Sequence, residues 1–140
     1  MKSPQKRRQP VILIADPDEE ERSLLRAILK LVGFQVIEAT NADQVVKIAR
    51  RKPPDLLVLD LTLPRLNGAE GVDLIRREAA LPSLPVVAVA LSNRKTRRPA
   101  TDSSTFFLPK PIEYERFYTL IDRFLPGQMT AFARSKCLPL

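Results

Sequence analysis

The chain has 140 residues, and its composition, 44% hydrophobic and 28% charged, is typical of a single globular domain that can bury a core. It has no histidine, which excludes histidine general bases and argues against a zinc site, and its single cysteine, Cys137, cannot form an internal disulfide. The net charge of +7 arises from two basic patches, each with four Lys or Arg residues, at residues 2–8 and 94–98, which are typical of solvated segments.

The first predicted element is a short apolar run at residues 11–15, which ends at Asp16. The run is too short for a signal peptide or a membrane span, so we expect a buried strand in a cytoplasmic protein. A helix follows, with Asp18 and Glu21 at the spacing of a capping box and Gly33 as the stop signal. The first strand is thus expected to lead directly into a helix with an acidic first turn.

A second strand and a second helix are predicted next. Residues 34–39 alternate in part between apolar and polar side chains, which is typical of a more exposed strand. Asn41 and Gln44 then open a helix, and Pro53 ends it after a basic last turn. The strand–helix pattern is therefore repeated before the middle of the chain.

The centre of the chain is an uninterrupted apolar run, residues 56–59, between Asp55 and Asp60. The run lacks polar alternation and suits a strand that is buried on both faces. In open parallel sheets the chemistry lies at the carboxyl ends of the strands, so Asp60 stands where a reactive carboxylate would be placed. A strand-capping role without chemistry is the alternative for this residue. Pro64 marks a loop before a helix that we expect over residues 69–80.

The last part of the chain contains two more predicted strands, at residues 84–91 and 105–108. Between them, residues 92–104 are polar, basic and interrupted by Pro99, so we expect no packed fourth helix there. The second of these strands leads to Lys110, and apolar residues at helical spacing predict a last helix after it. The alternation of five predicted strands with helices predicts a doubly wound α/β domain with a parallel sheet.

Three predicted strand ends carry charged groups, namely Asp16, Asp60 and Lys110. With these residues the sequence resembles the receiver domain of bacterial two-component response regulators, the CheY-like family. The matching motifs, which are specific only in their combined order and spacing, are Leu13-Ile14-Ala15-Asp16 with Arg22, Pro54 to Asp60, Leu63-Pro64 with Gly68, Pro85-Val86-Val87, and Phe107 to Pro111. The resemblance implies a five-stranded parallel sheet of order 2-1-3-4-5. We expect a basic N-terminal tail, a receiver-like domain and a C-terminal tail or linker at residues 1–10, 11–126 and 127–140.

The resemblance also implies a role for each strand-end residue. In this family the central aspartate, here Asp60, accepts a phosphoryl group from a histidine kinase or a phosphotransfer protein. The domain then signals to a downstream protein and is not expected to be an enzyme, beyond its own phosphorylation at Asp60 from a kinase or a small phosphodonor. Asp16, Asp60 and the backbone carbonyl of Thr62 would bind Mg²⁺. The ion is needed because its charge offsets the negative charges of the carboxylate and the phosphoryl group that react. Lys110 would contact the phosphoryl oxygens as a point charge.

The sequence also departs from the family pattern. The second acid of the first strand is replaced by Pro17, so we expect weak Mg²⁺ binding unless Asp18 compensates. The hydroxyl residue of strand four is replaced by Ala90, and the small residue that usually follows it is replaced by Leu91. The switch aromatic on strand five is Phe107, which has no phenolic oxygen. We therefore expect the link between phosphate and the output surface to be impaired.

The leading interpretation is an atypical receiver domain with Asp60 as the candidate phosphoacceptor. The alternative is a phosphorylation-independent pseudo-receiver that acts as a protein-binding module; Mg²⁺ titration separates the two, because a working site must bind the metal. Nucleic-acid binding through the basic patches is not favoured, since neither patch has interleaved aromatics. A phosphohydrolase with an aspartate nucleophile is not favoured either, because Thr62 stands where a second acid would be needed.

Overall fold

The computed structural model describes residues 9–66, 68–91 and 103–130, and within these ranges it contains five strands and four helices. The strands are β1 (Val11–Ala15), β2 (Gln35–Ala39), β3 (Leu56–Asp60), β4 (Val86–Leu91) and β5 (Thr105–Lys110). The helices are α1 (Glu19–Leu31), α2 (Ala42–Arg51), α3 (Gly68–Glu78) and α4 (Tyr114–Phe124). None of these helices has the length and apolar character needed to cross a membrane. The predicted alternation is confirmed, while most of residues 92–104, where no packed helix was expected, lies outside the described ranges.

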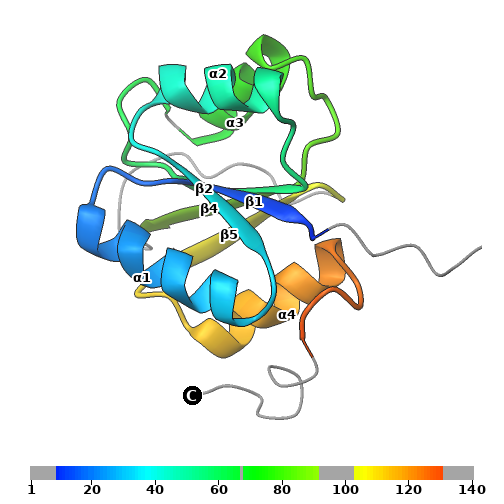
Figure 1. Ribbon diagram of the computed structural model, residues 1–140. Helices are drawn as coiled ribbons and strands as arrows, with labels where there is room; N and C mark the ends of the chain where they lie inside the picture. The colour runs from blue at the N-terminus through cyan, green and yellow to red at the C-terminus, as the bar shows by residue number, and fades with distance from the viewer. Residues whose placement is uncertain (1–8, 67, 92–102, 131–140) are drawn as a thin grey trace, which may run out of the picture.

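The sheet is parallel throughout, in the order β2-β1-β3-β4-β5, which confirms the expected topology. In the middle strand β3, Leu57 pairs with Leu13 on one side and Val86 on the other. β5 runs further than predicted, to Lys110, because Pro109 is tolerated on an edge strand. Helices α2 and α3 cover one face of the sheet, and α1 and α4 cover the other (Figure 1). The carboxyl ends of all five strands therefore meet at one edge, where such folds place their functional groups.

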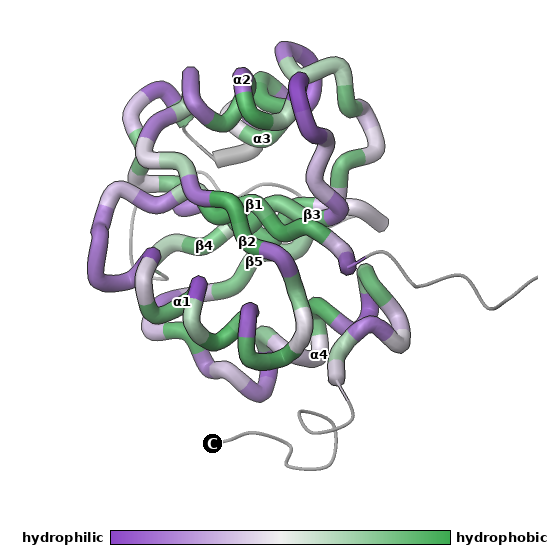
Figure 2. Tube along the Cα trace, viewed as in Figure 1, coloured by the Kyte–Doolittle hydropathy of each residue, from purple (hydrophilic) through white to green (hydrophobic). Residues whose placement is uncertain are grey.

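The central strands are buried on both faces, and alternate residues contribute to two separate cores. Leu13 and Leu57 pack toward α2 and α3, whereas their neighbours Ile12 and Leu56 pack toward α1 and α4. All four side chains are fully buried. In Figure 2 the strands form a hydrophobic layer between helices whose outer sides are more polar. The unbroken apolar runs of the sequence thus correspond to strands that helices cover on both sides.

The two ends of α1 follow the predicted signals, with one correction. Asp18 caps the helix, but its Oδ1 accepts a hydrogen bond from the N–H of Glu20 at 3.0 Å, and Glu21 does not complete the predicted capping box. The N–H of Asp18, which Glu21 would accept in a capping box, donates to Asp16 Oδ1 at 2.8 Å. The carboxylate of Glu21 bonds to the ammonium of Lys110. After the other end of the helix, Gly33 adopts φ +108°, a conformation that favours glycine.

The chain continues to pack on the domain after α4. The N–H of Thr130 donates to the carbonyl of Val32 at 3.0 Å, and Met129 lies against the core that α1 and α4 cover. The described residues of the expected C-terminal tail therefore contact the domain close to the end of α1.

Candidate functional site

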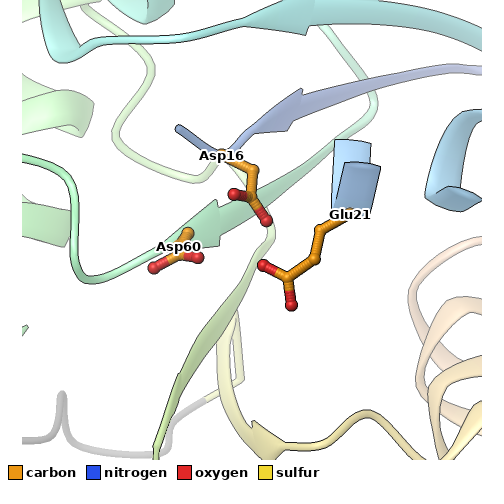
Figure 3. Close-up of side chains that lie close together, drawn as sticks. All are labelled: Asp16, Glu21 and Asp60. Carbon is orange, nitrogen blue, oxygen red and sulfur yellow. The ribbon is translucent and has the colours of Figure 1, made fainter. Parts of the chain in front are cut away.

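Two buried carboxylates lie at the carboxyl edge of the sheet. Asp60 is the last residue of β3, Asp16 directly follows β1, and their exposed fractions are 2% and 4%. Glu21, from the first turn of α1, extends toward both of them (Figure 3). One carboxylate oxygen from each of the three residues lies within 4.8 Å of the other two. The fold thus gathers acids from three different elements into one acidic cluster, defined by Asp16, Glu21 and Asp60.

Asp60 is held in one orientation by three hydrogen bonds. Its Oδ1 accepts from the backbone N–H and from the hydroxyl of Thr62, both at 2.7 Å. Its Oδ2 accepts from the Lys110 ammonium, also at 2.7 Å. Rotation of the carboxylate would disturb all three bonds, so its oxygens are preorganised. The backbone carbonyl of Thr62 stays a predicted metal ligand.

The ammonium of Lys110 bonds to two members of the acidic cluster, Asp60 and Glu21. Lys110 is the last residue of β5, and its ammonium donates to Glu21 Oε2 at 2.8 Å. Burial lowers the pKa of Lys110, but the hydrogen bonds to Asp60 and Glu21 outweigh this effect, so the pKa is raised above its ordinary value. The side chain therefore stays charged at neutral pH and can act as a fixed point charge.

Asp16 is less well compensated than Asp60. Burial raises the pKa of Asp16 to about 6, although its Oδ1 accepts a hydrogen bond from the N–H of Asp18 at 2.8 Å. The charges of Asp60 and Glu21 raise the pKa further, and the charge of Lys110 opposes them. The cluster thus carries more negative charge than one ammonium can offset, which favours a bound cation.

The oxygen donors of the acidic cluster fit Mg²⁺. The ion prefers oxygen ligands at about 2.0–2.1 Å, so that oxygens on opposite sides of it are about 4.2 Å apart. The cluster oxygens lie within 4.8 Å of one another, so small side-chain movements would allow Asp16, Glu21 and Asp60 to hold the ion. The sequence indicated Asp16 and Asp60 but not Glu21, whose capping-box spacing suggested a local role. The sequence signal that could have indicated Glu21 is its position next to Arg22, in the first helical turn after the end of the first strand.

The other predicted site residues lie around the cluster. Pro17 and Asp18 are exposed, and Asp18 caps α1. Ala90 is buried in the core that α2 and α3 cover, and the half-buried Phe107 packs against the same core. Leu91, at the end of β4, is 43% exposed. Neither Ala90 nor Phe107 can offer a hydroxyl group to this edge of the sheet.

The chain is similar to known signalling proteins over most of its length. The family model of the response regulator receiver domain matches residues 12–122. Protein PilH of Pseudomonas aeruginosa is 31% identical over 122 residues, which cover 83% of this chain and 98% of PilH. The polar-differentiation response regulator DivK of Brucella anthropi is 27% identical over 116 residues, with 81% and 94% covered. Among solved structures, the chemotaxis protein CheY4 of Vibrio cholerae has a TM-score of 0.68 at 18% identity, with 84% of this chain and 98% of that chain covered.

Proposed function

The chain belongs to the response regulator receiver domain family, and on that basis we propose that it is an atypical receiver module of two-component signalling whose phosphoacceptor is Asp60. The observation that carries the proposal is the position of Asp60 at the end of β3, buried beside Asp16 and bonded to Lys110. A carboxylate that only capped a strand would not need a second buried acid next to it.

In the proposed reaction an oxygen of Asp60 forms a bond to phosphorus while the bond from phosphorus to the leaving group of the donor breaks. Thr62 holds Asp60 Oδ1, so the carboxylate is oriented before the donor arrives. Lys110, bonded to Asp60 Oδ2, can direct its charge toward the transferred oxygens. Mg²⁺, which receiver domains typically bind, would supply further positive charge at the acidic cluster.

The atypical character of the module rests on residues around the site. Pro17 supplies no carboxylate, so we infer that Mg²⁺ binds weakly. Ala90 has no hydroxyl with which to bond a phosphoryl group, and Phe107 has no phenolic oxygen that could exchange partners. Phosphorylation would therefore cause little change in the surface that binds the downstream protein. That protein would bind a surface that is the same with and without the phosphoryl group, such as α4.

The proposed phosphoryl donors are a histidine kinase or a phosphotransfer protein, and a cytoplasmic location is part of the proposal. The second candidate is a pseudo-receiver, which binds its partner without phosphorylation. The observation that favours this second candidate is Ala90 on β4, where the family has a hydroxyl residue. Without that hydroxyl, a phosphoryl group on Asp60 cannot move the switch residue Phe107 in the usual way.

The test is the intact mass of the protein after incubation with Mg²⁺ and a small phosphodonor. We expect one phosphoryl group to be added to the wild type and none to Asp60→Asn. A wild-type protein that stays unmodified with several donors would favour the pseudo-receiver.

A further inference from the structure

On the basis of the proposed function, which this inference deepens, we propose that Glu21 is the third carboxylate of the Mg²⁺ site. It would take the place of the acid that Pro17 cannot supply. The helix α1 would then contribute a metal ligand that the strand end lacks, and Glu21 would have a metal-binding role in addition to its bond with Lys110.

The first support is the position of the Glu21 carboxylate. Pro17 is exposed and has no oxygen in its side chain, whereas a Glu21 oxygen lies within 4.8 Å of oxygens from both Asp16 and Asp60. Figure 3 shows the three side chains converging from β1, β3 and α1. Asp18, the replacement ligand that the sequence suggested, is exposed and uses its Oδ1 to cap α1. Glu21 is therefore better placed than Asp18 to complete the site.

The second support is the way the first turn of α1 is fixed over the end of β1. The Arg22 guanidinium donates from Nη1 to the backbone carbonyl of Asp16 at 2.9 Å and from Nε to Glu38 Oε1 at 3.1 Å. Because Arg22 follows Glu21 directly, these bonds keep the Glu21 backbone close to the strand end. The side chain of Glu21 can then reach the cluster without any movement of the helix.

The third support is the cation that Glu21 already contacts. The Lys110 ammonium bonds to Glu21 Oε2 at 2.8 Å and to Asp60 Oδ2 at 2.7 Å, so positive charge is held between these two carboxylates. Glu21 is 40% exposed in its side chain, which leaves it free to exchange this bond for a metal ion while Lys110 keeps Asp60. Because the bond to Lys110 would have to be given up, we expect binding through Glu21 to be weaker than binding through a strand-end acid without this partner.

The experiment is a calorimetric titration of the metal-free full chain with Mg²⁺ alone. We expect Glu21→Gln to weaken the affinity by at least about tenfold, as loss of a charged ligand does. Glu20→Gln is the matched control, because Glu20 lies in the same turn and is exposed; its affinity should stay within about twofold of the wild type. Adding Pro17→Asp to Glu21→Gln should restore binding, and urea unfolding of each variant verifies that it is folded.

Each outcome decides between the possible roles of Glu21. Equal Mg²⁺ affinities for the wild type and Glu21→Gln would overturn the inference and leave Glu21 as a partner of Lys110 only. A wild type that binds no Mg²⁺ would overturn it as well. If Mg²⁺ binding depends on Glu21 but the wild type accepts no phosphoryl group, the proposed function fails while the metal assignment stands. If phosphorylation proceeds and Glu21→Gln binds Mg²⁺ normally, only the metal assignment fails.

Discussion

The ammonium of Lys110 lies 2.7 Å from Asp60 Oδ2, although the two residues are 50 positions apart in the sequence. The contact joins the ends of β3 and β5, which are not neighbours in the sheet, because β4 lies between them. An ion pair that only fastens two strands and a lysine that awaits a phosphoryl group share this geometry. Substitutions at the site can separate the two roles.

Lys110→Met removes the ammonium and leaves the buried Asp60 without its charged partner. We expect the free energy of unfolding at pH 7 to fall by about 2–4 kcal/mol, as for other broken buried pairs. Urea unfolding measures this change. In an Asp60→Asn background the same substitution should cost about half as much or less, since the carboxylate is no longer charged. Equal losses in the two backgrounds would show that Lys110 stabilises the fold independently of Asp60.

Asp16→Asn should stabilise the metal-free protein in a pH-dependent way. Burial raises the pKa of Asp16 from 3.8 to about 6, so the folded state holds this proton more tightly than the unfolded chain does. The free energy of unfolding of the wild type should therefore fall as pH rises from about 4 to about 6, by about 2–3 kcal/mol from this group. Asparagine avoids this loss and can still accept the N–H of Asp18 through its Oδ1.

The measurement for Asp16→Asn is urea unfolding with a chelator at pH 3.5 and at pH 7.5. The variant should be more stable than the wild type at pH 7.5 and should match it at pH 3.5. If the variant and the wild type differ in free energy of unfolding by the same amount at both pH values, the ionisation of Asp16 does not cause the difference.

Pro17→Asp should tighten Mg²⁺ binding in the otherwise unchanged chain. The new carboxylate would lie next to Asp16 and, unlike Glu21, would have no bond to Lys110 to give up. Titration with Mg²⁺ measures the gain, and Pro17→Asn serves as the uncharged control. Equal affinities for the wild type and Pro17→Asp would show that the existing carboxylates already supply all the acidic ligands that the ion needs.

Phe107 should keep one ring position with and without a phosphate mimic at Asp60. The ring packs against the core that also contains Ala90, and Ala90 offers no hydroxyl that a phosphoryl group could draw inward. The ring position can be followed by crystallography or aromatic NMR, with and without beryllofluoride and Mg²⁺. A clear inward movement of the ring on loading would mean that the switch works by another route.

The strands and most helix boundaries could be predicted because their signals are local: unbroken apolar runs, helix caps, proline and glycine. The order of the strands came from the family resemblance, since periodicity does not show which strands are neighbours. Glu21 could not be assigned from its spacing, because its competing partner, Lys110, is 89 positions away. The backbone carbonyl of Thr62 stays a predicted metal ligand, and the structure adds that the N–H and hydroxyl of the same residue orient Asp60. The bond between Lys110 and Glu21 is a tertiary contact, and such contacts override local patterns at the site.

The central claim is that Asp60 accepts the phosphoryl group, and the most direct test is to locate that group in the chain. Borohydride reduction converts a phosphorylated aspartate to homoserine, which tandem mass spectrometry of peptides can assign to a position. After incubation with a small phosphodonor and Mg²⁺, we predict homoserine at Asp60 and at no other aspartate. Homoserine at Asp16 or Asp18, or labelling that persists in Asp60→Asn, would contradict the assignment.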